Sequence, residues 1–101
     1  MASANPLEKE IEAKLRKMVE SHNGRCLKWV CPGWAGVPDR MILLPGGNVI
    51  FVETKRPKGG ALSKRQEKWG EILGGLGFLY FVVWDYEDIC TVEQSIKEYI
   101  L

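Results

Sequence analysis

The chain has few of the residues that build disulfide frameworks and zinc sites. Its three cysteines, Cys26, Cys31 and Cys90, form no CxxC pair, and His22 is its single histidine. An odd number of cysteines with one histidine fits neither a disulfide scaffold nor a tetrahedral zinc site. We therefore expect the cysteines to be small buried side chains in a reducing compartment.

Long apolar runs are also missing. No stretch approaches the roughly 20 apolar residues that span a membrane. The first residues, MASANPLEKEIEAKLRK, contain no apolar core of a secretory signal. The sequence therefore predicts an intracellular protein that is not secreted and has no membrane partner. Its 101 residues, 46% hydrophobic and 27% charged, fit one globular domain over 1–101.

A strong overall charge is absent too, since the formal net charge is +1. The charges are nevertheless unevenly distributed. Residues 55–68 carry six basic side chains against Glu67, whereas residues 85–98 carry five acidic side chains against Lys97. A local basic surface is what binding to phosphates requires, although a solvated helix would have a similar composition.

The hydrophobic pattern predicts the order α-β-β-β-α-β-α. The first helix should start at Pro6, with Asn5 as its cap and Glu8 as its capping-box acid, and end near residue 21. Strands are expected at 25–30, 39–44, 49–55 and 78–84, and further helices at 63–74, capped by Ser63 and Gln66, and 92–100, capped by Thr91. The apolar run FLYFVVW (78–84) favours a central strand covered on both faces. The fold class is α/β, with a mixed sheet flanked by helices and a C-terminal helix.

Charged residues end the most apolar strand of the predicted hairpin, in the segment GVPDRMILLPGGNVIFVETK (36–55). Glu53 and Lys55 share one strand face, and Thr54 points to the other. A structural ion pair would explain Glu53 and Lys55, but Asp39 lies at the mouth of the partner strand. Asp39 shares their face only if it pairs with Glu53 or Lys55, which needs an odd-length loop such as Gly46-Gly47-Asn48, or a twist at the entrance. A two-residue turn would pair it with Thr54.

In the favourable register, two neighbouring carboxylates need a cation between them. Oxygen ligands without His or Cys suit Mg²⁺ or Mn²⁺. Such an ion activates water and neutralises charge on a phosphate, and a nearby lysine stabilises the transition state. Asp39, Glu53 and Lys55 therefore indicate phosphodiester hydrolysis.

The motifs PD (38–39) and ETK (53–55), in this order of elements, resemble the PD-(D/E)xK nuclease superfamily. More narrowly, GVPDR, LLPGG and FVETKRP, preceded by LKWVCPG and followed by Gln66, resemble the VRR-NUC family of virus-type replication-repair nucleases. The resemblance implies a restriction-endonuclease-like αβββαβ core. It also implies a small phage-type enzyme of the bacterial cytoplasm that cuts branched DNA, such as four-way (Holliday) junctions, as a homodimer.

The resemblance also implies residue roles. Asp39, Glu53 and the backbone carbonyl of Thr54 would bind the metal, and Lys55 would be the catalytic lysine. Gln66 would lie near the site, although reciprocal capping with Ser63 explains it equally well. A helix acid, Glu12 or Glu8, would contribute directly or through water; we favour Glu12, because Glu8 is explained as a capping acid.

Contacts to DNA are expected from the basic segment that follows Lys55, namely Arg56, Lys58, Lys64, Arg65 and Lys68. Arg40 could contribute or form a structural ion pair. Trp34, in a Gly/Pro loop, could stack on a splayed base, anchor a dimer or close the core. Trp29, Trp69 and Trp84 are expected in the core.

Three other functions remain open at this stage. The chain could be a nuclease for flap, splayed-arm or duplex DNA, or a catalytically inactive DNA-binding module of the same fold. It could also be a protein adaptor in which the PD and ExK motifs are coincidental. The adaptor does not explain charges at the mouth of an apolar hairpin.

Overall fold

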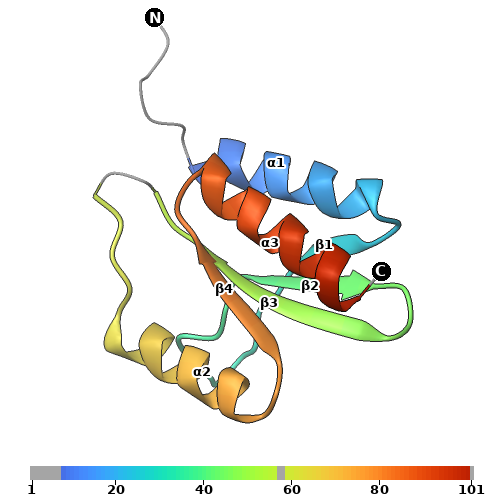
Figure 1. Cartoon of the computed structure of the whole chain (residues 1–101). Helices are drawn as coiled ribbons and strands as arrows, with labels where there is room; N and C mark the ends of the chain where they lie inside the picture. The colour runs from blue at the N-terminus through green and yellow to red at the C-terminus, as the bar shows by residue number, and fades with distance from the viewer. Residues whose placement is uncertain (1–7, 57–58, 101) are drawn as a thin grey trace, which may run out of the picture.

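A computed structural model describes residues 8–56 and 59–100 as a four-stranded sheet between helices (Figure 1). The elements are α1 (Glu8–Ser21), β1 (Arg25–Lys28), β2 (Arg40–Leu44), β3 (Asn48–Thr54), α2 (Lys64–Gly75), β4 (Leu79–Val83) and α3 (Tyr86–Tyr99). The predicted order α-β-β-β-α-β-α and the α/β class with a mixed sheet are confirmed. Asn5, Pro6 and Lys58 lie outside the described residues.

The sheet has the strand order β1-β2-β3-β4. The first three strands form an antiparallel meander, and β4 runs parallel to β3 after a crossover through α2. The expectation that the apolar run at 78–84 is a central strand is wrong, because β4 lies at the edge of the sheet. Its apolar composition has another cause: α2 packs on one of its faces and α3 on the other.

The main core lies between the sheet and the pair α1 and α3, on the face opposite α2 (Figure 1). Alternate strand residues supply it, such as Ile42 in β2 and Ile50 and Val52 in β3, all with no exposed surface. On the face of α2, Phe51 packs between Trp29 and Phe78, with ring centroids 5.0 and 5.1 Å apart. The charged end of β3 belongs to this second face.

Two helix starts test the predicted caps. Ser63 and Gln66 form the expected capping box at the start of α2. The prediction that Thr91 caps the last helix is wrong: α3 begins at Tyr86, and Asp85 is the cap, accepting the backbone N–H of Asp88. An aspartate is a good cap in its own right, so the helix begins a turn and a half earlier.

The cysteines are only partly as expected. Cys26 and Cys31 are half-buried, whereas Cys90 is exposed on α3, so the expectation of burial is wrong for Cys90. No helix among residues 8–56 and 59–100 is long and apolar enough to cross a membrane.

Candidate active site

The hairpin has the odd-length loop that brings its two acids together. Leu44 pairs with Asn48, which leaves Pro45-Gly46-Gly47 as the loop, one residue earlier than the example considered from the sequence. Both loop glycines have positive φ, 84° and 76°, which glycine adopts without strain. Because Arg40 pairs with Val52, the next position along places Asp39 opposite Glu53.

Asp39 is held in place from both neighbouring strands. Its backbone carbonyl accepts the N–H of Trp29 at 2.8 Å. Its carboxylate accepts two hydrogen bonds from Thr54, one from the backbone N–H at 3.1 Å and one from the hydroxyl at 2.6 Å. Thr54 is 1% exposed, so the aspartate is anchored to a rigid part of β3.

Glu53 is buried, with 4% of its surface exposed, on the same face as Phe51. Its Oε2 atom accepts a hydrogen bond from Gln66 Nε2 at 3.1 Å and lies 3.7 Å from Lys55 Nζ. The backbone N–H of Lys55 donates to Val83 of β4 at 2.9 Å, which fixes the chain as it leaves the sheet. One carboxylate, one ammonium and one amide thus meet where an apolar strand ends.

Gln66 serves the helix and the site at the same time. Its Oε1 atom accepts the backbone N–H of Ser63 at 2.9 Å, and the Ser63 hydroxyl accepts the backbone N–H of Gln66 at 3.1 Å. Because the amide oxygen of Gln66 accepts the hydrogen bond of the cap, the NH₂ group of the same amide is directed to Glu53. The capping box with Ser63 is confirmed, Gln66 also contacts Glu53, and its role in catalysis stays a prediction.

The charges of the site work against one another. Burial, and then the charge of Asp39, raise the pKa of Glu53 to about 7, although Lys55 lowers it. Burial also raises the pKa of Asp39 above its ordinary value, against the lowering effect of the Thr54 hydrogen bonds. Burial together with the charges of Glu53 and Asp39 raises the pKa of Tyr80 to about 12. A positive charge between the acids would lower the pKa of all three groups.

The donor atoms fit a hard divalent cation. Asp39 and Glu53 offer carboxylate oxygens. The N–H and C=O of one strand residue point to the same side, so the carbonyl of Thr54 is directed, like its N–H, toward Asp39. An all-oxygen set suits Mg²⁺ or Mn²⁺. Within the described ranges, no three His, Cys, Asp or Glu side chains cluster in a way that could hold a metal. Magnesium in other proteins is often bound through one or two carboxylates and otherwise keeps water or phosphate ligands.

The two candidate acids of α1 have different surroundings. Glu12 forms a salt bridge with Arg40, so the structural pairing considered for Arg40 is present. The charge of Glu8 instead raises the pKa of both Asp39 and Glu53. Glu12 is thus paired with Arg40, whereas the charge of Glu8 acts on both acids; which of the two serves the site stays a prediction.

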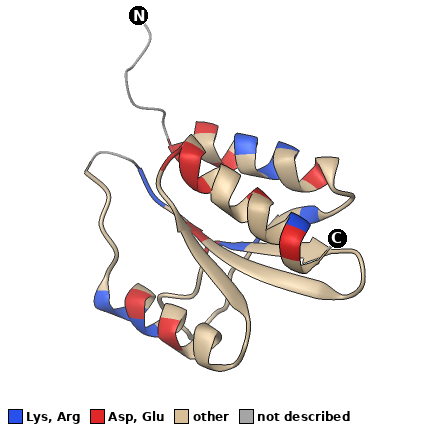
Figure 2. Cartoon of the chain, in the orientation of Figure 1, with Lys and Arg blue, Asp and Glu red and all other residues tan. Residues whose placement is uncertain are grey.

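Four of the five basic residues predicted to contact DNA lie among the residues that the structure describes. Lys64, Arg65 and Lys68 are exposed on α2, and Arg56 is exposed just after β3. Figure 2 shows basic and acidic positions alternating along α2, and a basic position where the chain leaves β3. The cations of α2 thus lie on the helix that contacts Glu53 through Gln66.

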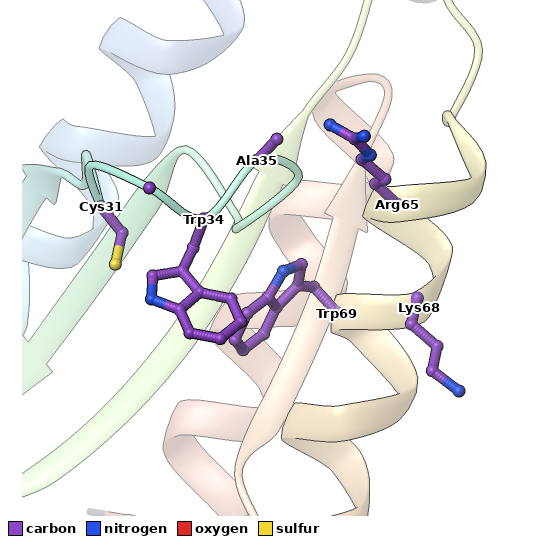
Figure 3. A pocket seen from close by; sticks show the side chains of 7 residues that line it. Cys31, Trp34, Ala35, Arg65, Lys68 and Trp69 are labelled. Carbon is purple, nitrogen blue, oxygen red and sulfur yellow. The ribbon is translucent and has the colours of Figure 1, made fainter.

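A hollow of about 610 Å³ lies between the loop before Asp39 and helix α2. Trp34 from the loop and Trp69 from the helix meet in it edge to face, with ring centroids 6.0 Å apart (Figure 3). Trp69 is thus part of an open hollow, and the expectation that it belongs to the core is wrong. The loop touches α2 closely at Gly36, where a Cβ atom would lie 2.6 Å from the Cβ of Arg65.

Known proteins resemble this arrangement in structure and in sequence. A solved "VRR_NUC domain" aligns over 91% of this chain and 96% of its own, with a TM-score of 0.79 and 25% identity. The "Putative nuclease p44" of Acyrthosiphon pisum secondary endosymbiont phage 1 is 45% identical over 51 residues. These likenesses support membership of the VRR-NUC family. The aligned segment covers about half of this chain and half of the phage protein. No family model matches the chain.

Sequence-based reasoning missed three contributors to the candidate site: the Thr54 hydroxyl, Tyr80 and Trp69. Tyr80 belongs to the run 78–84, which was interpreted as core throughout. Because β4 runs parallel to β3 with Phe51 opposite Tyr80, the tyrosine shares the face of Glu53. Its signal was present, since a tyrosine at period two with Phe78 and Val82 marks a partly polar face.

Proposed function

We propose that this VRR-NUC chain is a divalent-metal-dependent endonuclease that hydrolyses phosphodiester bonds in DNA. The observation that carries the proposal is the meeting of Asp39 and Glu53, with raised pKa values, beside Lys55 and Gln66 at the end of an apolar strand. Burying carboxylates costs stability, and a fold retains such a cost chiefly where the groups have a chemical role.

Each residue of the site has a separate task in this proposal. Asp39 and Glu53 bind the metal, with Thr54 fixing the first acid and Gln66 the second. Mg²⁺ or Mn²⁺ bound there would supply an activated water and neutralise charge on the scissile phosphate. Lys55, 3.7 Å from Glu53, orients the attacking water and stabilises the negative charge that develops on the phosphate.

The substrate we propose is branched DNA, with the four-way junction as the first candidate. The exposed cations of α2 and Arg56 bind phosphates and read the shape of the DNA rather than its base sequence. A chain of this size covers only a small surface, and a two-fold junction presents two equivalent strands. We therefore propose a symmetric homodimer that places one site on each strand.

The test is cleavage of a labelled four-way junction and a matched duplex in Mg²⁺, Mn²⁺ or EDTA. We expect metal-dependent, paired cuts near the branch point, and the loss of at least two orders of magnitude in rate in Lys55→Ala. Lys17→Ala, an exposed lysine on α1, is the matched control and should cleave like the wild type.

Three outcomes would change the proposal. Metal-dependent cutting of the duplex alone would keep the nuclease and remove the junction. Binding of the junction without cleavage in any metal would indicate a DNA-binding module. A single uncoupled cut, with a monomeric mass in light scattering, would remove the homodimer.

A further inference from the structure

We propose that the hollow between Trp34 and Trp69 binds one unpaired nucleobase of the DNA strand that is cut. The inference rests on the proposed nuclease function and extends it, because it names the structural feature of DNA that the chain recognises next to its acids. The hollow has an aromatic wall, a cationic rim and a fixed position relative to the catalytic residues.

The aromatic wall is available for stacking. Trp34 keeps 63% of its surface exposed although it lies edge to face with Trp69. A contact of this geometry covers at most one face of either ring, so an indole face remains free for a base. The volume, about 610 Å³, is within the range of small-ligand sites, about 300–1,000 Å³.

The lining has the charge that a nucleotide requires. Besides the two tryptophans it consists of small residues and two cations, Arg65 and Lys68, and it contains no acidic residue. Figure 3 shows the Arg65 side chain at the upper rim of the hollow, whereas the Lys68 ammonium is directed away from the two rings. Arg65 is therefore the cation that would meet the phosphate of a base held against Trp34.

Rigid contacts connect the hollow to the acids. Gly36 packs directly on Arg65, and its φ of +91° is one that other residues rarely adopt. Asp39 follows three residues later on the same loop. On the helix, Arg65 precedes Gln66, which donates its hydrogen bond to Glu53. A base in the hollow would thus fix the register of the strand relative to the acids.

This arrangement predicts a preference for DNA with an unpaired or easily unpaired nucleotide next to the cut. A base inside a duplex is stacked on both sides and cannot enter an aromatic hollow without the cost of unstacking. Branch points and splayed arms supply such a base at little cost. The hollow would therefore select the branch itself.

The test is a thermodynamic cycle between one side chain and one base. A fluorescent splayed-arm DNA is titrated in EDTA at low ionic strength, and each unpaired nucleotide near the branch is replaced in turn by an abasic one. For the wild type, one abasic position should weaken binding by roughly 5- to 100-fold, as expected for the loss of one base–aromatic stack. Trp34→Ala should lose a similar factor on the intact DNA and nothing further on that abasic DNA.

Two controls accompany the cycle. Trp34→Phe keeps an aromatic face and should retain most of the affinity. Tyr99→Ala removes an aromatic side chain that is 72% exposed at the end of α3 and should bind like the wild type. Thermal melting by circular dichroism verifies that Trp34→Ala is folded.

Independent, additive losses from Trp34→Ala and the abasic position would overturn the inference. An absence of any position-dependent loss, or of any binding to splayed DNA, would overturn it as well. The cycle needs no cleavage. Coupling without cleavage in Mg²⁺ or Mn²⁺ would therefore refute the nuclease while keeping the base site, whereas cleavage without coupling would do the reverse.

Discussion

Replacing Glu53 by glutamine should make the metal-free protein more stable, and the gain should depend on pH. The buried carboxyl has a pKa of about 7, against an ordinary value of 4.5. Each unit of pKa difference between folded and unfolded states corresponds to about 1.36 kcal/mol. Holding Glu53 charged in the folded chain therefore costs up to about 3 kcal/mol at pH 8.

The sign follows from proton binding. Between pH 4.5 and 7 the folded state holds a proton on Glu53 that the unfolded state has released. The contribution of this group to stability is fully present below pH 4.5 and is lost as the pH rises through 7. Glutamine does not titrate and keeps an oxygen for the Gln66 amide, so the variant lacks this loss.

The assay is urea unfolding in EDTA from pH 4.5 to 8.5, followed by tryptophan fluorescence. The difference in unfolding free energy between Glu53→Gln and the wild type should grow by about 2–3 kcal/mol across that range. Glu71→Gln, on the exposed side of α2, should show no such growth. Added Mg²⁺ should recover stability in the wild type more than in the variant. A difference that stays constant within about 0.5 kcal/mol would refute the reasoning.

Three further substitutions test the supports of the site. Thr54→Val removes the hydroxyl that donates to Asp39 at 2.6 Å. The affinity for Mn²⁺, measured by calorimetry, should fall about 10- to 100-fold, and Thr54→Ser should restore it. Gly36→Ala places a methyl group against Arg65 at a φ of +91°. The free energy of unfolding should fall by about 1–3 kcal/mol in chemical unfolding. An unchanged midpoint would mean that the loop is not packed tightly on α2. Glu12→Ala leaves the Arg40 guanidinium without its Glu12 partner. We expect the free energy of unfolding to fall by about 1–3 kcal/mol, with little change in metal affinity. Unchanged stability together with lost metal binding would instead indicate that Glu12 is a metal ligand.

The sequence was sufficient for the seven elements and their order, because these follow from local hydrophobic period and spacing. The sequence was not sufficient for the hairpin register: from the sequence alone, Asp39 could lie opposite Glu53, Thr54 or Lys55. The register depends on which residues form the loop, and Gly46 and Gly47 tolerate several turns. Only the backbone geometry selects among them.

Other features could not be predicted from the sequence, because different structures share the same sequence pattern. A strand covered by helices on both faces is apolar whether it is central or at an edge, so β4 could not be located from its composition. Glu8 and Glu12 share a helix face one turn apart, and only the position of Arg40 distinguishes them. In the same way, amphipathicity does not reveal that Trp69 lies opposite the loop of Trp34.

The Gln66 side chain makes two hydrogen bonds, one to the helix cap and one to Glu53. The residue at this position can therefore be used to compare related sequences. A helix cap accepts glutamate as readily as glutamine three residues after the serine. Glu53 does not tolerate a glutamate at position 66, because Glu53 accepts a hydrogen bond from the Gln66 NH₂ group and would be repelled by a third carboxylate. Among chains that share the PD and ExK motifs, we expect S-x-x-Q to keep both contacts and S-x-x-E to keep the helix cap alone.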